Sequence, residues 1–485
     1  MSQTSQPAPS KSPSTGVPSE LLEAFRSAGQ EHVFQHWQEL GASARENLLG
    51  QLREVDLGLL RRLGAASSAQ PSGRPVDRKP TEVLRLGAEP AETSRAEAVD
   101  EGWRLLREGK VGVFLVAGGQ GSRLGFDGPK GCLPAGPLSG KTLFQLHAEK
   151  ISRLKARAGA SLPWYVMTSA ANDDDTRRYF EEHRYFGLPR EDVRFLRQRM
   201  LPALDTRGKL ILASSSELFL SPNGHGGAYS AFRESGCLED ARSRGIEHLF
   251  YFQVDNILIR IADPLFLGLH SLGGSEMSFK VLRKTGPDEK IGVVAVENGK
   301  PTVVEYSDLS PEEARLRDAA GDLVYWAGSI AIHAFRLDFF ARVAEGGIEL
   351  PYHAARKSIP ALGADGRTAE VDGVKFETFV FDALPFTKRH LHLEVRREEE
   401  FGPIKNRTGV DSLETAQALL VEEHRRWLLE AGVPAKGKVE VSPLAAIDPR
   451  ELTDRLDPMP SPIGDADVEV EPDASGRVKL APAGR

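Results

Sequence analysis

Cysteine is scarce in this sequence of 485 residues, which contains only Cys132 and Cys237. Two thiols cannot form a disulfide framework or a four-thiolate zinc site, and so few cysteines are typical of proteins from a reducing compartment. Long apolar runs are missing as well, because no stretch reaches the roughly 18 uninterrupted apolar residues that a membrane helix requires. We therefore expect a cytoplasmic protein that has no membrane partner.

The N-terminal residues lack the apolar segment of a secretory signal and are rich in proline and serine. This composition predicts a disordered tail over residues 1–19. A large excess of one charge is also missing, since 62 Lys and Arg stand against 69 Asp and Glu, a net charge of −7. This balance argues against nucleic-acid binding, which requires a basic surface. The sequence leaves the oligomeric state open between a monomer and a weak dimer.

The middle of the chain contains apolar runs of strand length that alternate with helical patterns. Strands are predicted over residues 111–117, 164–168 and 249–254, and helices over residues 143–154 and 176–183. Continuous apolar strands that alternate with helices are typical of a mostly parallel sheet with both faces covered. The pattern therefore predicts an α/β fold.

Other local patterns refine this prediction. Residues 292–296, 302–306 and 390–395 alternate between apolar and polar side chains, which predicts antiparallel additions to the sheet. Two capping boxes, at residues 43–46 and 94–97, predict the starts of helices.

Changes in composition divide the chain into parts. After the tail we expect a helical region over residues 20–95, a catalytic domain over 96–395 and a C-terminal domain over 396–485. Within the helical region, the small and polar residues 64–74 predict a loop.

A glycine-rich segment follows the first predicted strand directly. Gly118, Gly119 and Gly121 let the backbone approach an anion, and its N–H groups can surround a phosphate. Arg123 and Lys130 add positive charge at fixed offsets. The segment therefore predicts a phosphate-binding loop.

Two familiar nucleotide motifs are incomplete here. A dinucleotide fingerprint that starts at Gly119 would need its third glycine at Leu124, which disfavours a dehydrogenase. Residues 140–142 resemble the end of a P-loop, but Ala135 replaces its first glycine and no predicted strand leads into it. An ATP-using kinase or NTPase built on Lys141 remains as a rival hypothesis.

Further segments, collinear over roughly residues 20–450, resemble the UDP-sugar pyrophosphorylases, and within them the eukaryotic-type UDP-N-acetylglucosamine pyrophosphorylases. The resemblance implies a central Rossmann-like, GT-A-like nucleotidyltransferase domain with a mixed sheet, an N-terminal helical region and a small C-terminal β-containing domain. The segments that carry it are residues 115–130, 141–145, 185–188, 200–202, 254–258, 303–307, 379–382, 400–401, 404–406 and 441–444.

The resemblance also implies a reaction. A uridylyltransferase of this kind forms UDP-hexose and pyrophosphate from UTP and a hexose-1-phosphate, with Mg²⁺, in nucleotide-sugar biosynthesis. N-acetylglucosamine-1-phosphate or glucose-1-phosphate is the favoured sugar phosphate. Because the attacking phosphate oxygen is already an anion, no general base is required, and catalysis depends on positioning and charge neutralisation.

By the same resemblance, three cations act on the phosphates, namely Arg123, Lys130 and Lys405. The nucleotide is expected to contact Leu115, Ala117, Gly118, Gly119, Gln198 and Gly224. The sugar is expected to contact His225, Gly292, Glu305 and Ser329. Asp255 and Asp382 each follow a short apolar run, where a carboxylate could hold Mg²⁺ beyond the end of a strand.

Two of these positions leave the identity of the sugar substrate undecided. The acetamido-sugar enzymes that the chain resembles carry asparagine where His225 and Ser329 stand, and histidine after glycine is also the pattern of glucose and broad-range enzymes. A broad-range UDP-sugar pyrophosphorylase is therefore an alternative. A non-catalytic UDP-sugar sensor is another, although such a sensor would not need Lys130 and Asp255.

Overall fold

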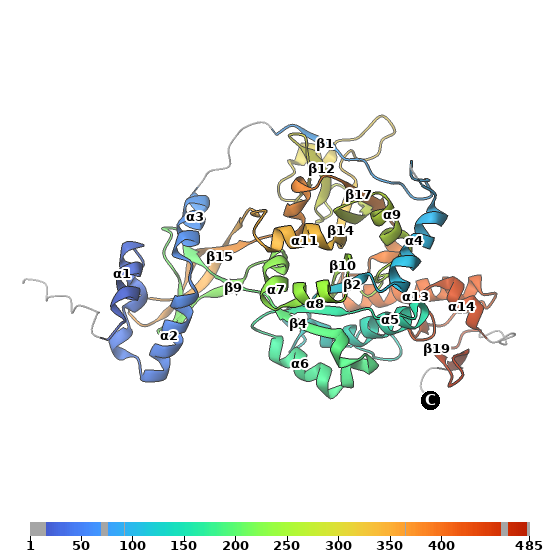
Figure 1. Ribbon diagram of the computed structural model, residues 1–485, viewed down its shortest axis with the longest axis horizontal. Coiled ribbons are helices and arrows are strands. Elements are labelled where there is room, and N and C mark those ends of the chain that lie inside the picture. Colours follow the sequence, from blue (N-terminus) through green and yellow to red (C-terminus); the bar gives the residue numbers. More distant parts are fainter. Residues whose placement is uncertain (1–15, 69–75, 92, 364, 457–463, 483–485) are drawn as a thin grey trace, which may run out of the picture. The chain divides into compact units, whose positions relative to one another are not determined.

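The computed structural model describes residues 16–68, 76–91, 93–363, 365–456 and 464–482 (Figure 1). Most of the predicted tail, residues 1–15, lies outside the described residues. The chain forms two compact units, and the predicted domain boundaries after residues 19, 95 and 395 stay a prediction. The first unit comprises the chain up to Pro75, Arg199–Gly226 and Leu350–Phe379, and the second comprises Val76–Gln198, Gly227–Glu349 and Val380–Arg485.

The first unit combines helices with short antiparallel sheets around its own core. Aromatic side chains of the N-terminal helices, among them Phe34 and Trp37, pack in one cluster with Val374 and Phe376. The helices are α1 (Ser19–Ser27), α2 (Ala42–Glu54), α3 (Leu57–Ser68) and the 3-10 helices η1 (Glu31–Phe34) and η2 (Trp37–Glu39). The strands are β5 (Met200–Pro202), β6 (Leu204–Asp205), β7 (Leu212–Ser214), β8 (Glu217–Leu218), β9 (Leu220–Pro222), β15 (His353–Leu362) and β16 (Thr368–Glu377).

Two local predictions for this unit are wrong. Helix α2 begins at Ala42, one residue before the predicted cap, and its N-cap Gly41 offers no side chain to accept a hydrogen bond. Helix α3 continues through the first part of the predicted loop at residues 64–74, because Leu60 and Leu63 are buried in the core. Burial of an apolar face thus outweighs the cost of a glycine within a helix. Residues 69–74 of that loop lie outside the described residues.

The second unit contains the large mixed sheet, whose main path runs β1-β12-β14-β10-β2-β3-β4. Strands β10, β2, β3 and β4 are mutually parallel, whereas β12 and β14 pair antiparallel to their neighbours. This confirms the predicted α/β, Rossmann-like fold with a mixed sheet. The strands are β1 (Arg78–Pro80), β2 (Val111–Val116), β3 (Trp164–Thr168), β4 (Val193–Arg197), β10 (His248–Gln253), β11 (Met277–Arg283), β12 (Val293–Glu297), β13 (Lys300–Val304), β14 (Ala327–Arg336) and β17 (His390–Glu394).

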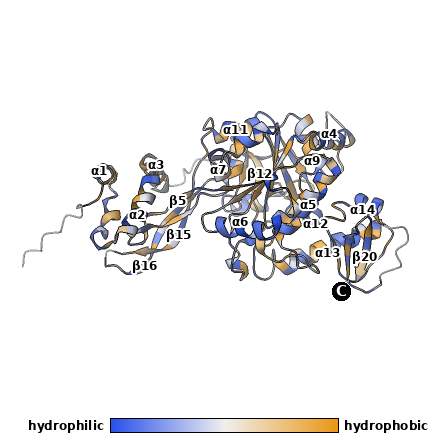
Figure 2. Ribbon diagram, turned by 60° about the horizontal axis from the view of Figure 1, so that its bottom comes forward, coloured by the Kyte–Doolittle hydropathy of each residue, from blue (hydrophilic) through white to orange (hydrophobic). Residues whose placement is uncertain are grey.

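Helices cover this sheet and bury its apolar strands, and hydrophilic and hydrophobic residues alternate along these helices (Figure 2). The capping box at the start of α4 is confirmed, because Ser94 Oγ accepts a hydrogen bond from Glu97 N at 3.1 Å. The helices are α4 (Arg95–Arg107), α5 (Leu143–Ala158), α6 (Asp173–Glu182), α7 (Ala228–Glu234), α8 (Cys237–Ser243), α9 (Pro264–Leu272), α10 (Pro311–Arg315), α11 (Leu337–Ala344), α12 (Arg397–Glu400), α13 (Leu413–Glu430) and α14 (Pro449–Arg455).

One strand direction differs from the prediction. The pairs β12–β13 and β12–β14 are antiparallel as expected, but β17 runs parallel to its neighbour β11. The chain enters β17 through the 3-10 helix η8 (Val380–Phe386) and not through a hairpin turn. A hairpin would have forced an antiparallel pair, and an alternating side-chain pattern does not distinguish the two directions.

The C-terminal residues of this unit form a small three-stranded sheet of β18 (Val439–Val441), β19 (Val468–Pro472) and β20 (Val478–Pro482). Its apolar face packs with Trp427 and Leu428 of α13 in one buried cluster. Across the part of the chain that the structure describes, no helix has the length and apolar character needed to cross a bilayer.

Glycines set the closest approach between two helices of the second unit, α4 and α9. A Cβ atom at Gly102 would lie 1.9 Å from Pro264 O, and one at Gly268 would lie 1.7 Å from Ala98 O. Side chains at both positions are therefore incompatible with this packing.

We expect Gly102→Ala to lower the free energy of unfolding by about 2–3 kcal/mol, because the helices must separate to admit a methyl group. Thermal unfolding followed by circular dichroism measures the effect. Gly50→Ala in α2 is the matched control, since nothing lies within 4 Å of a Cβ there. The Gly50→Ala control should raise the free energy of unfolding by up to ~1 kcal/mol, because alanine has a higher helix propensity than glycine. Equal melting temperatures for the two variants would contradict the close approach of α4 and α9.

Candidate active site

The carboxyl ends of four parallel strands form one edge of the large sheet. Val116 of β2 is in register with Gln253 of β10 and Met167 of β3, and Thr168 is in register with Arg197 of β4. The residues that follow these strands therefore emerge side by side. In open α/β sheets ligands bind beyond this edge.

Side chains that follow β3 hold the glycine-rich loop after β2 in shape. Ser169 Oγ donates to Gly118 O at 2.8 Å, and Asn172 Nδ2 donates to Ala117 O at 2.8 Å and to Gly119 O at 3.2 Å. These hydrogen bonds to residues after β3 fix the loop carbonyls, so the protein itself supports the shape of the loop. Ser169 and Asn172 are supporting residues that the sequence prediction missed.

Gln198 follows β4 and places its amide directly over the loop. A Cβ atom at Gly118 would lie 2.7 Å from Gln198 Nε2, so only glycine allows this approach. The backbone of Gln198 is fixed by donation from its N–H to Thr168 O at 2.9 Å. The predicted nucleotide residues Gly118 and Gln198 are thus brought together at the strand edge.

An ion pair joins the loop to the strand beside it. Lys130 Nζ lies 2.9 Å from Asp255 Oδ2, and the two side chains are only 16% and 10% exposed. Lys130 begins the short helix η4 (Lys130–Cys132), and Asp255 follows β10. The two predicted residues therefore meet although 125 positions separate them.

Backbone contacts place Lys405 beside Asp255. Ile404 N donates to Asp255 O at 3.0 Å, and Asn256 holds the same segment through Gly402 N, which donates to Asn256 Oδ1 at 2.9 Å. The ammonium group of Lys405 lies 5.3 Å from the centre of the Phe401 ring. A third predicted phosphate residue is thus carried by a segment anchored to the strand that leads to Asp255.

Two exposed arginines flank the turn at Gly125, which closes η3 (Ser122–Leu124) with a positive φ of 76°. Arg123 lies within η3, and a Cβ atom at Gly125 would lie 3.4 Å from Arg407 Nε. Among the described residues, neither guanidinium group has an ion pair or a side-chain hydrogen bond. Arg407 was not predicted, although its position two residues after Lys405 was a usable signal.

The predicted sugar residues of the second unit also lie together. Ser329 N donates to Gly292 O at 2.8 Å, and a Cβ atom at Gly292 would lie 3.3 Å from Glu305 Oε1. Strands β12, β13 and β14 supply this cluster. It brings a hydroxyl and a carboxylate together beside a glycine, whose missing side chain lets Glu305 approach the backbone.

Gly224 and His225 belong to the first unit. Gly224 has a positive φ of 80°, and a Cβ atom there would lie 2.4 Å from Thr378 O. The His225 ring stacks on Phe379 with the ring centres 5.2 Å apart, and Phe379 stacks in turn on His353. Burial lowers the pKa of His225 to about 4, with the charge of His353 adding to the effect, so the imidazole is neutral at pH 7.

Carboxylates do not form a complete metal cage in this structure. Over the described ranges, no three His, Cys, Asp or Glu side chains gather in a way that could hold an ion. The second predicted metal ligand, Asp382, lies in η8, where its charge helps to raise the pKa of the buried Tyr229, after burial itself and Tyr251. Asp255 alone fits a metal ion whose other ligands come from substrate phosphates and water.

The rival P-loop hypothesis is contradicted by the position of Lys141. Its ammonium group lies 3.0 Å from Glu149 Oε2 and 3.0 Å from Glu471 Oε1, and it donates to Ser442 Oγ at 3.1 Å. Three side chains of the fold satisfy this cation. Lys141 therefore ties α5 to the C-terminal residues and does not bind phosphate.

A sequence profile described as UTP–glucose-1-phosphate uridylyltransferase matches residues 87–449, three quarters of the chain. The chain belongs to this family. It is therefore a nucleotidyltransferase of the UTP:sugar-1-phosphate uridylyltransferase class. Membership confirms the resemblance that the ordered sequence segments predicted.

Individual relatives extend over most of the chain. The UDP-N-acetylhexosamine pyrophosphorylase-like protein 1 of Homo sapiens is 41% identical over 430 residues, covering 84% of this chain and 85% of the relative. The UDP-N-acetylglucosamine pyrophosphorylase of Saccharomyces cerevisiae is 37% identical over 447 residues, covering 86% and 92%. The crystal structure of the UDP-N-acetylglucosamine pyrophosphorylase from Trypanosoma brucei, in complex with inhibitor, has a TM-score of 0.77 at 28% identity, covering 91% and 95%.

Proposed function

We propose that this protein forms a UDP-hexose and pyrophosphate from UTP and a hexose-1-phosphate, with N-acetylglucosamine-1-phosphate as the preferred acceptor. The observation that carries the proposal is the Lys130–Asp255 pair, 2.9 Å apart at the carboxyl ends of β2 and β10. It puts a cation and a potential metal ligand at the one edge of the sheet where a triphosphate would meet both. A cytoplasmic location fits a chain with two unpaired thiols.

The proposed reaction is a displacement at the α-phosphorus of UTP. An oxygen of the sugar phosphate attacks, a new P–O bond forms, and the bond to the oxygen that bridges the α- and β-phosphates breaks with its electron pair. The leaving group is pyrophosphate, and no proton has to be removed from the attacking oxygen. Lys130 and Arg123 neutralise the leaving pyrophosphate, and Lys405 orients the sugar phosphate.

The nucleotide base is proposed to bind at Gly118 and Gln198. A glutamine amide both donates and accepts hydrogen bonds, which matches the imide edge of uracil. Among the described residues, no protein group forms a hydrogen bond with the side-chain amide of Gln198, so the amide is available to a base. The absence of a side chain at Gly118 lets the Gln198 amide lie directly over the loop, where the base would meet it.

We propose Mg²⁺ as the metal, held by Asp255 and by phosphate oxygens of the nucleotide. When bound, the ion would neutralise charge on the transferring phosphate. The ion pair with Lys130, 2.9 Å long, orients the Asp255 carboxylate. Asp382 is proposed as a more distant carboxylate on the metal side.

The acceptor sugar is proposed from the relatives' names and from the cluster of Gly292, Glu305 and Ser329. Two of the relatives described above carry N-acetylglucosamine in their names, at 37% and 28% identity. Ser329 and the neutral His225 replace the two asparagines of the acetamido-sugar enzymes that the chain resembles. We therefore propose that the enzyme accepts acetamido sugars, but that it prefers them over plain hexoses less strongly than an enzyme with asparagine at both positions.

Pyrophosphate release tests the function and the sugar together. It is measured with UTP and, in parallel, the 1-phosphates of glucose, galactose, N-acetylglucosamine and N-acetylgalactosamine. The double variant His225→Asn, Ser329→Asn should raise the ratio of kcat/KM for acetamido over plain sugars about tenfold, which corresponds to ~1–2 kcal/mol for one satisfied buried polar group.

The double variant His183→Asn, Ser243→Asn makes the same replacements at exposed positions and should change no ratio. An unchanged sugar ratio in the first double variant would show that these two positions do not select the sugar. Binding of UDP-sugar without any consumption of UTP would instead support the sensor alternative.

A further inference from the structure

A cavity of about 330 Å³ lies within the second unit, and neither Lys130 nor Asp255 lines it. It is bounded by α4, α5, α13 and the segment after β10. Its volume is at the lower end of the range for small-molecule pockets. Much of its wall is apolar and aromatic, formed by Trp103, Leu146, Leu154, Leu420 and Trp427.

Two cations with unused donors line the same cavity. Lys150 Nζ donates to Ile257 O at 2.7 Å and to Ile259 O at 3.0 Å, which leaves one of its three N–H groups for another acceptor. Arg260 Nε is buried and has no acceptor among the described residues. A buried donor without an acceptor is unfavourable, so a ligand that supplies one is stabilised there.

The surroundings of these cations are poorly solvated. Burial lowers the pKa of Lys150 to about 8, and it raises the pKa of Glu423 to about 7. Glu423 lies 3.3 Å from Arg260 Nη2, and Glu399 lies 3.1 Å from the same atom. Both carboxylates bind the outer end of the guanidinium group and leave its Nε unpaired.

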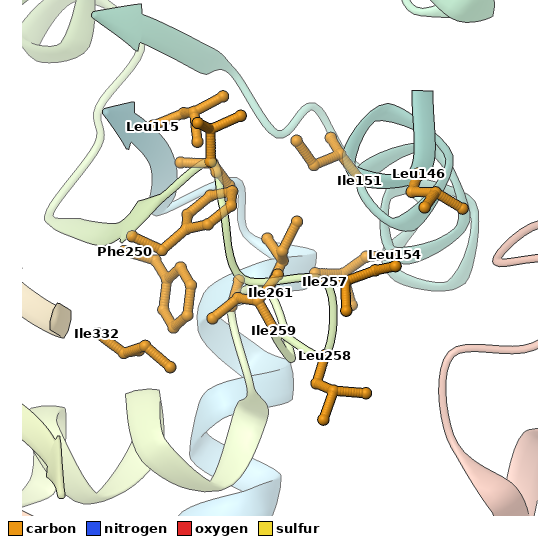
Figure 3. Packing of buried hydrophobic residues seen from close by; sticks show 14 of the residues in the cluster. Leu115, Leu146, Ile151, Leu154, Phe250, Ile257, Leu258, Ile259, Ile261 and Ile332 are labelled. Carbon is orange, nitrogen blue, oxygen red and sulfur yellow. The ribbon is translucent and has the colours of Figure 1, made fainter. Parts of the chain in front are cut away.

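The same lysine supports the segment that carries Asp255. Ile257, whose carbonyl accepts from Lys150, lies two residues after Asp255, and His147 Nε2 is 3.0 Å from Val254 O on the other side. Helix α5 thus contacts the backbone on both sides of this aspartate. Figure 3 shows Leu154 of α5 beside Ile257 of that segment, and all four of Leu146, Leu154, Ile257 and Ile259 belong to one buried cluster.

We propose that this cavity is a regulatory site for a small amphipathic carboxylate, whose apolar ring system fills the aromatic wall and whose two oxygens accept from Lys150 and Arg260 Nε. A carboxylate offers two acceptor oxygens, one for each of these donors. A charged ligand bound to the spare N–H of Lys150 competes with the carbonyls of Ile257 and Ile259 for the ammonium group and so weakens the support of Asp255. The binding site stands independently of the proposed function, whereas its effect on turnover rests on it.

Isothermal titration calorimetry of the full chain with 2-naphthoate tests the site. We expect one binding site per chain with a Kd on the order of 0.1–1 mM, typical of a fragment of this size. Naphthalene-2-methanol has the same ring system without the charge and should bind at least tenfold more weakly. Lys150→Met should weaken 2-naphthoate binding to the level of the alcohol.

Ala446→Leu is the matched variant that fills the cavity from its buried wall while keeping both cations. It should abolish binding and keep the circular dichroism spectrum and melting temperature of the wild type. Absence of saturable heat from the wild type up to about 10 mM 2-naphthoate would overturn the site. So would equal affinity for acid and alcohol, or unchanged binding in folded Ala446→Leu.

The link to Asp255 is tested by pyrophosphate release at saturating 2-naphthoate. We expect at least a threefold fall in rate in the wild type and no change in Ala446→Leu. Binding without any change in rate would overturn the link while leaving the binding site. A wild type that releases no pyrophosphate at all would contradict the proposed function, and the heat of binding would still report on the cavity.

Discussion

Replacing Lys130 with alanine is expected to lower the rate of pyrophosphate release about a thousandfold, which corresponds to ~4 kcal/mol of lost transition-state stabilisation. The physical reason is the position of its ammonium group, 2.9 Å from Asp255 just after β10, where charge is proposed to develop on the leaving pyrophosphate. The fall should appear in kcat more than in the KM for sugar phosphate. Coupled detection of pyrophosphate under saturating UTP measures it.

The chain offers a matched control for this variant. Lys110 and Glu247 form an ion pair of 2.8 Å at the amino ends of β2 and β10, the opposite ends of the strands that lead to Lys130 and Asp255. Lys110→Ala removes a similar ion pair and should retain nearly full turnover. If Lys130→Ala keeps more than about a tenth of the wild-type rate with its fold intact, Lys130 does not neutralise the leaving group.

Asp255→Asn should have the second large effect. The amide keeps the size of the side chain and can still accept from Lys130, but it loses the charge that holds a divalent cation. We expect kcat to fall about a hundredfold and the Mg²⁺ concentration for half-maximal rate to rise at least tenfold. Initial rates measured over a series of Mg²⁺ concentrations separate the two effects.

Glu247→Gln is the corresponding control at the other end of the strands and should leave the Mg²⁺ dependence unchanged. Asp255→Asn could lower the rate without changing the Mg²⁺ concentration for half-maximal rate. That result would show that Asp255 does not bind the metal and acts only as the partner of Lys130. Together with Lys130→Ala, this result would distinguish a metal ligand from a residue that only orients the lysine.

The large sheet and the strand-edge site were predictable because their signals are local. Buried parallel strands appear in the sequence as continuous apolar runs, and β2, β3 and β10 lie within one residue of their predicted bounds. In such sheets ligands bind at the carboxyl ends of the strands. This rule assigns Lys130 and Asp255 to one site even though the sequence does not show that they form an ion pair.

Other features were not predictable because they depend on distant contacts. The direction of β17 is decided by its pairing with β11, more than a hundred residues earlier in the chain. The three partners of Lys141 come from α5 and from the C-terminal residues. None of these contacts leaves a periodic pattern in the sequence.

The first unit is built from segments that lie far apart in the sequence, and this affects its folding during synthesis. Phe34 and Trp37 emerge from the ribosome early, but Val374 and Phe376, which complete their cluster, follow only after roughly 340 further residues. At 5–20 residues per second this interval lasts about 17–70 s. Throughout that time the N-terminal aromatic side chains lack their final neighbours and present an apolar surface that a chaperone can bind. The nascent chain, and not the finished enzyme, is therefore the form most exposed to aggregation.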